Sequence, residues 1–128
     1  MPVAGGETVL VVEDADDLRE VIERILTANG YKVMLAASGP DALDLIRGTK
    51  RRVDMLLTDV VMARMQGDEV AERVRELQPR TRVLYMSGYA QTQAASVKAL
   101  EPILEKPFTE PDLLAKIDQV LQGSVSGT

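Results

Sequence analysis

Two spacings of apolar residues alternate along the chain. Runs of consecutive apolar residues predict buried strands over residues 8–12, 32–37, 53–59, 82–86 and 103–105. Between these runs, apolar residues recur every three or four positions, which predicts amphipathic helices. The residues expected to face inward are Leu18, Val21, Ile22, Ile25 and Leu26 in the first helix, Ala42, Leu43 and Ile46 in the second, Val70, Ala71, Val74 and Leu77 in the third, and Leu113, Leu114, Ile117, Val120 and Leu121 in the last.

Short polar signals mark the helix ends. Ser38 is a good N-cap for the second helix, and residues 109–112 resemble a capping box before the last one. A helix is also predicted over residues 91–100, although its apolar face is weak. We expect one domain over residues 1–122, followed by a flexible Gly/Ser tail over residues 123–128.

The regular alternation of strand and helix predicts an α/β fold. Five strands separated by helices favour a doubly wound, five-stranded parallel sheet of the (βα)5, flavodoxin-like type. We expect the strand order 2-1-3-4-5, in which the first and third strands flank the point where the order reverses. In such sheets the chemistry lies just beyond the carboxyl ends of the strands, at that point.

Composition narrows the classes of function. The 128 residues carry a net charge of −5 and contain no run of five basic residues, so nucleic-acid binding through this domain is not expected. Cysteine and histidine are absent, which excludes thiol chemistry, a histidine base and histidine metal ligands. No basic segment precedes Arg19, and no apolar stretch approaches the roughly 20 residues that span a bilayer. We therefore expect a cytoplasmic domain without membrane contact.

Polar side chains follow four of the predicted strands at the point where each strand ends. They are Glu13 and Asp14, Asp59, Ser87 and Lys106. Taken singly, each has an ordinary explanation: the acids could cap helices or begin turns, the serine could form a turn, and the lysine could be a solvated charge. Because parallel strands end at one edge of a sheet, we expect the five side chains to lie together instead.

Each residue type has a chemical use at such an edge. Carboxylates without soft ligands suit Mg²⁺, and a carboxylate beside that ion can attack a phosphoryl group to form an acyl phosphate. The ammonium of Lys106 and the hydroxyl of Ser87 could stabilise the transferred group by position and charge. The pattern therefore fits phosphoryl chemistry at this edge, with Asp59 placed to act as a nucleophile or a metal ligand.

The same residues resemble the receiver domain of two-component response regulators. The resemblance rests on the motifs Val-Val-Glu-Asp, Leu-Leu-Thr-Asp-Val-Val-Met, Met-Gln-Gly, Met-Ser-Gly-Tyr-Ala and Glu-Lys-Pro-Phe at residues 11–14, 56–62, 65–67, 86–90 and 105–108. It implies that Asp59 is the phosphoacceptor and that Glu13, Asp14, Asp59 and the backbone carbonyl of Val61 hold Mg²⁺. Ser87 would be the switch hydroxyl, Lys106 would contact the phosphate, and the Lys106–Pro107 bond would be cis.

The resemblance also implies partners. The donor would be a histidine kinase or a histidine phosphotransfer domain, and an unknown downstream protein would read the surface of the last two helices. Whether phosphorylation causes dimerisation is left open. The weak helix over residues 91–100 resembles receivers attached to hybrid histidine kinases. Such a domain accepts a phosphoryl group and is not a turnover enzyme.

Three positions depart from the family pattern. Ala63 stands where proline is usual, Ile103 stands where the switch residue is often aromatic, and Val61 stands where a polar side chain often positions the hydrolytic water. The Val61 departure predicts slow loss of the phosphoryl group.

Three other classes remain as alternatives. A haloacid-dehalogenase-like phosphatase also uses an aspartate after a strand, but it needs a second aspartate where Val61 stands. A pure interaction module of the same fold would be expected to have lost one of the acids or the lysine. A flavin-binding relative would have few rings to stack on the flavin, since only 3% of residues are aromatic, and its purified form would be coloured.

Overall fold

The computed structural model describes residues 6–62, 64–88, 100 and 102–123. Five parallel strands form one sheet in the order β2-β1-β3-β4-β5, as predicted. The strands are β1 (Thr8–Val12), β2 (Lys32–Ala36), β3 (Met55–Asp59), β4 (Arg82–Gly88) and β5 (Ile103–Lys106). In the part of the chain that the structure describes, the helices are α1 (Asp16–Ala28), α2 (Gly39–Gly48), α3 (Gly67–Leu77) and α6 (Glu110–Gln122).

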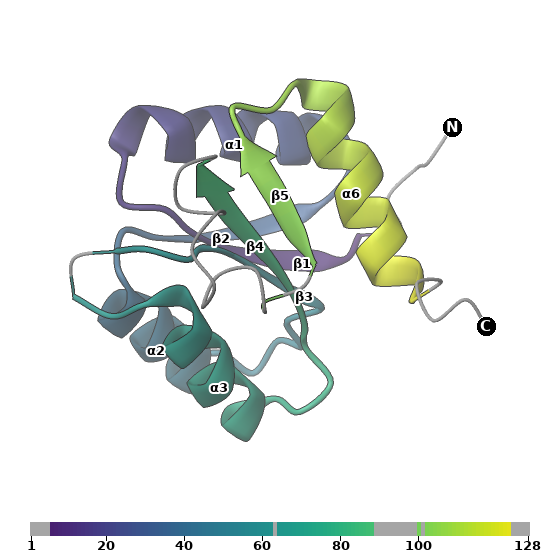
Figure 1. The fold of residues 1–128 in the computed structure, drawn as a ribbon. Coiled ribbons are helices and arrows are strands. Elements are labelled where there is room, and N and C mark those ends of the chain that lie inside the picture. The colour runs from purple at the N-terminus through teal and green to yellow at the C-terminus, as the bar shows by residue number, and fades with distance from the viewer. Residues whose placement is uncertain (1–5, 63, 89–99, 101, 124–128) are drawn as a thin grey trace.

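Helices cover both faces of the sheet (Figure 1). On one face, α2 and α3 pack over a core that includes Leu10, Leu56 and Val70. On the other face, α1 and α6 pack over a core that includes Leu57 and Ile117. Strands β1 and β3 are buried along their whole length, which explains their largely apolar sequences. None of the helices within the described ranges is both long enough and apolar enough to cross a bilayer.

The predicted helix caps are present. The Ser38 hydroxyl accepts a hydrogen bond from the backbone N–H of Asp41 at 3.3 Å. Thr109 and Asp112 exchange the two hydrogen bonds of a capping box, at 3.1 and 3.2 Å. The Lys106–Pro107 bond is cis, as the family resemblance implied.

Strand and helix boundaries differ by a few residues from the predictions. The third strand begins at Met55 rather than at Val53, because the backbone N–H and carbonyl of Val53 bond to the side chains of Gln78 and Thr81 instead of a neighbouring strand. The fourth strand extends two residues further, through Gly88, and the fifth one residue further, through Lys106. The helix expected over residues 91–100 lies, except for residue 100, outside the described residues.

Two residues predicted to face inward are exposed. Val21 and Leu77 each have an exposed fraction of 45%. The buried face of α1 is centred on Leu18, Ile22 and Leu26, so Val21 falls at its margin. Leu77 is the last residue of α3, and its side chain lines a surface hollow.

Candidate functional site

The carboxyl ends of the central strands bring together residues far apart in the chain. Glu13 directly follows β1, and Asp59 is the last residue of β3. Because Val12 pairs with Thr58, the two acids stand side by side at this edge. Lys106 ends β5, and its long side chain reaches the same place from the far side of β4.

A buried ion-pair network joins three of these residues. The Lys106 Nζ atom lies 2.5 Å from Asp59 Oδ1 and 2.8 Å from Glu13 Oε1. Glu13 is 1% exposed and Asp59 4% exposed, whereas the Lys106 side chain is 26% exposed. Asp59 Oδ2 is buried and has no hydrogen-bond partner among the described residues. A buried oxygen without a partner is uncommon and is consistent with a bound ion at this site.

The turn after β1 is held in place by three contacts. The second oxygen of Glu13 accepts a hydrogen bond from the backbone N–H of Ala15 at 2.9 Å. Arg19 donates from Nη1 to the backbone carbonyl of Glu13 at 2.8 Å, and its Nη2 atom lies 2.6 Å from Asp16. These contacts fix the acidic turn relative to α1. Asp14, which lies in that turn, is exposed.

Burial and close contact shift three pKa values. Burial, reinforced by the neighbouring Glu13, raises the pKa of Asp59 to about 7 in spite of the Lys106 charge. Burial would also raise the pKa of Glu13, but hydrogen bonds from Asp59, Lys106 and the backbone of Ala15 outweigh it and lower that pKa. Burial opposes the charge of Lys106, but contacts with the two carboxylates prevail and raise its pKa.

Glu13, Asp14 and Asp59 form a set of donors that fits a hard divalent cation. One oxygen from each carboxylate lies within 4.8 Å of the others. The donors are all carboxylate oxygens, as Mg²⁺ prefers, and the buried Oδ2 atom of Asp59 lacks a partner. The residues present therefore match the metal expected from the sequence.

A glycine lets α3 begin directly against the end of β3. A Cβ atom on Gly67 would lie 2.0 Å from the backbone oxygen of Asp59, closer than any side chain can approach. The Gly67 N–H donates to the carbonyl of Val60 at 2.7 Å, which closes the loop after the strand. The position of Asp59 therefore depends on a residue without a side chain.

The other two predicted site residues lie nearby without a described contact to the ion-pair network. Ser87 is buried in β4, one residue after the Met86 that pairs with Asp59, and its hydroxyl donates to the Gly88 carbonyl at 3.3 Å. Val61 follows β3 by two residues, and its side chain is 45% exposed. Ala63 lies outside the described residues.

Sequence reasoning missed the supporting roles of Arg19 and Gly67. The arginine could have been found from its spacing, because Arg19 follows Asp16 by three residues at the start of a helix. The glycine precedes a helical pattern after a strand and loop, a place where close backbone approach is common. Neither sequence pattern predicts which backbone carbonyl Arg19 or Gly67 contacts.

Comparison with known proteins agrees with this arrangement. The profile of the response regulator receiver domain matches residues 9–118. The sensor kinase CckA of Brucella abortus is 34% identical over 123 residues, which cover 94% of this chain and 13% of CckA. The receiver protein CpdR of the same organism is 30% identical over 88% of this chain and 95% of CpdR. The response regulator MprA of Mycobacterium sp. (strain KMS) is 34% identical over 89% of this chain but only half of MprA.

Solved structures give the same result. The receiver domain of the hybrid histidine kinase CckA superposes with a TM-score of 0.76 at 30% identity, covering 90% of this chain and 99% of that one. A response regulator receiver protein from Sinorhizobium medicae superposes with a TM-score of 0.79 at 31% identity, covering 92% and 96%. With the profile match over most of its length, this chain belongs to the response regulator receiver domain family of two-component signalling.

Proposed function

We propose that Asp59 accepts a phosphoryl group from a phosphorylated histidine on another domain. The observation that carries the proposal is the contact of Lys106 with both Asp59 and Glu13 around the unpartnered Oδ2 atom of Asp59. A cation already held beside a carboxylate is placed to meet the charge of an incoming phosphoryl group without reorganisation. The receiver family acts in signalling rather than as a turnover enzyme, which agrees with this role.

The transfer needs little from the protein beyond position and charge. An oxygen of ionised Asp59 forms a bond to phosphorus while the bond between phosphorus and the donor's imidazole nitrogen breaks, and the electron pair of that bond stays with the imidazole. Lys106 neutralises charge on the phosphoryl oxygens, and the Ser87 hydroxyl can turn from Gly88 to donate to one of them. The donor histidine must come from elsewhere because this chain has none.

The metal in this proposal is Mg²⁺, held by Glu13, Asp14, Asp59 and the carbonyl of Val61. Three of the four donors are the carboxylates within 4.8 Å of one another. When bound, the ion would add positive charge that favours the ionised carboxylates and offsets the charge of the phosphoryl group. Arg19 supports these donors by fixing the turn that carries them.

The proposed output is a change of surface that a partner reads. Phosphorylation would shift an equilibrium between two conformations, in which Ser87 moves toward the phosphoryl group and the surface of the last two helices changes. The donor would be a histidine kinase or a histidine phosphotransfer domain. The surface of the last two helices would then bind a downstream protein or, if phosphorylation causes dimerisation, a second copy of this chain.

We also propose a cytoplasmic location, because phosphohistidine is made with ATP. The proposed receiver domain comprises residues 1–122, and residues 123–128 form its tail.

The decisive experiment adds acetyl phosphate and Mg²⁺ to the purified protein and measures the intact mass. One phosphoryl group should be added, and Asp59→Asn should abolish the addition. The matched control is Asp17→Asn, which removes an exposed carboxylate of α1 and should leave the addition unchanged. Labelling of the Asp59→Asn variant at the wild-type stoichiometry would place the acceptor elsewhere.

A second experiment tests the metal. Beryllofluoride, which mimics the acyl phosphate, should bind only when a divalent cation is present and should be released by a chelator. Binding that is indifferent to chelation would contradict the carboxylate site. The phosphatase alternative has less support, because the position of its second aspartate is taken by the exposed side chain of Val61.

A further inference from the structure

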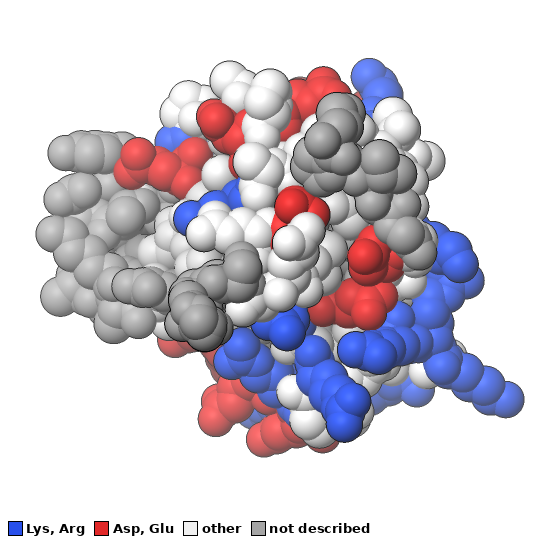
Figure 2. All heavy atoms as spheres, turned by 90° about the vertical axis from the view of Figure 1, so that its right-hand side faces the viewer, with Lys and Arg blue, Asp and Glu red and all other residues white. Residues whose placement is uncertain are grey.

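A strongly basic surface lies at the amino-terminal ends of the strands, opposite the end of the sheet that carries Asp59. Residues 47–54 and 75–82 contain seven Lys or Arg and two carboxylates, a net charge of +5, so the rest of this −5 chain carries −10. Both segments lead into the amino ends of central strands, β3 and β4. In Figure 2 most Lys and Arg side chains of the face shown gather together in its lower half.

This surface is hollowed. Two hollows of about 370 and 480 Å³ share Pro79, Arg80 and Thr81 as a common wall. Arg52 and Leu77 line the first, and Arg82 lines the second. We call the two together the arginine groove, defined by Arg52, Leu77, Pro79, Arg80 and Arg82. Within the described ranges, Arg52 alone of its three arginines forms an ion pair, with Asp54 at 3.3 Å.

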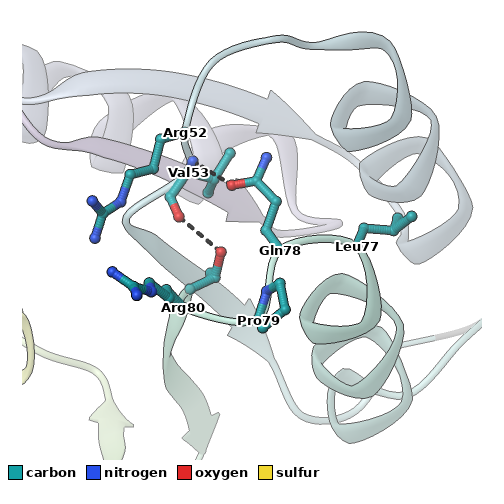
Figure 3. A pocket seen from close by; sticks show the side chains of 7 residues that line it. Arg52, Val53, Leu77, Gln78, Pro79 and Arg80 are labelled. Atoms are coloured by element: carbon teal, nitrogen blue, oxygen red, sulfur yellow. Dashed lines mark hydrogen bonds between the residues drawn. The ribbon is translucent and has the colours of Figure 1, made fainter.

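The floor of the arginine groove is built from hydrogen bonds between its two loops. Gln78 Oε1 accepts from the N–H of Val53 at 2.7 Å, and its Nε2 atom donates to the Arg51 carbonyl at 3.1 Å. The Thr81 hydroxyl donates to the Val53 carbonyl at 2.7 Å. Figure 3 shows Arg52 and Arg80 extending on one side of Gln78 and Leu77 on the other. A groove whose loops are already held by hydrogen bonds loses little conformational entropy when a ligand binds.

The arginine groove combines cations with an exposed apolar side chain. Leu77 is 45% exposed and Pro79 is exposed beside it. Guanidinium groups bind carboxylates in a two-pronged fashion, and Arg is enriched at protein interfaces. No aromatic side chain lines either hollow among the described residues, so a nucleic-acid strand would find no ring on which its bases could stack. We propose that the arginine groove binds an acidic segment of a partner protein, whose carboxylates meet Arg52, Arg80 and Arg82 while an apolar side chain covers Leu77.

The test uses a short fluorescein-labelled peptide in which Glu and Asp flank a single Leu, with binding followed by fluorescence anisotropy on the whole chain. The peptide should bind saturably and more weakly as salt rises. Arg80→Glu should weaken binding by about tenfold or more, as expected for loss and reversal of a close charge pair. Arg24→Glu, which alters another exposed arginine, on α1, should have little effect. Asp59→Asn should bind as the wild type does, so this result is independent of the phosphoacceptor proposal.

Four results would overturn the inference. The first is equal binding of a peptide with Gln and Asn in place of the acids, and the second is unchanged binding by Arg80→Glu and Arg52→Glu proteins that melt like the wild type. Tighter binding of a single-stranded oligonucleotide than of the peptide would assign the surface to nucleic acid. Self-association that Arg80→Glu abolishes would assign it to a second copy of the chain.

Discussion

The buried Asp59 carboxylate should make the metal-free protein less stable as the pH rises from 5 to 8, and Asp59→Asn should remove that loss. The pKa of Asp59 is raised from 3.8 to about 7 in the folded protein. Between these values the unfolded chain has released the proton while the folded chain retains it. A raised pKa of this kind costs stability as the pH climbs through that interval, and the cost stops growing above the folded pKa.

The size of the effect follows from the width of that interval. One unit of pKa difference corresponds to about 1.4 kcal/mol. From pH 5 to pH 7 the wild-type free energy of unfolding should therefore fall by about 2 to 3 kcal/mol, with little further change to pH 8. Neither neighbour contributes in this window, because the pKa of Glu13 is lowered from 4.5 and that of Lys106 is raised from 10.5.

Urea unfolding followed by circular dichroism, in EDTA at constant ionic strength, measures this dependence. The free energy of unfolding of Asp59→Asn should change less between pH 5 and pH 8 than that of the wild type. Asp17→Asn, which removes an exposed carboxylate, should show the same pH dependence as the wild type. Added Mg²⁺ should stabilise the wild type at pH 8 and affect Asp59→Asn much less, since a ligand stabilises only the state that binds it. Equal slopes in the wild type and Asp59→Asn would refute the assignment of a buried, proton-retaining Asp59.

Two further predictions concern the residues that support the site. Gly67→Ala should lower the free energy of unfolding by about 1–3 kcal/mol, because the new methyl group would lie 2.0 Å from a backbone oxygen at the end of β3. Gly48→Ala, whose methyl group would have nothing within 4 Å, should be neutral or slightly stabilising. Urea unfolding measures both variants, and equal effects would contradict the close approach at Gly67. Arg19→Ala should weaken Mg²⁺ binding several-fold in an equilibrium titration, because the acidic turn loses its hydrogen bond to the arginine. Arg24→Ala should leave the Mg²⁺ affinity unchanged. An unaltered affinity in Arg19→Ala would show that the turn holds its shape without this arginine.

Much of the fold was determined locally and could be read from the sequence. Strands β1 and β3 are buried on both faces, which explains why they are apolar except for Thr8 and for Thr58 and Asp59 at the end of β3. The capping box at Thr109 and Asp112 needs only neighbours three residues apart. The site residues were predictable because parallel strands end at one edge, whatever the details of packing.

Tertiary structure alone decided which of those residues touch. Glu13 and Asp14 are adjacent and chemically alike, yet Glu13 is buried against Lys106 while Asp14 stays exposed. Leu77 likewise has helical spacing with the buried Val70 and Val74, and yet it is exposed. Helical spacing reports which side of a helix is apolar, but contacts across tens of residues are chosen by packing, which no local pattern contains.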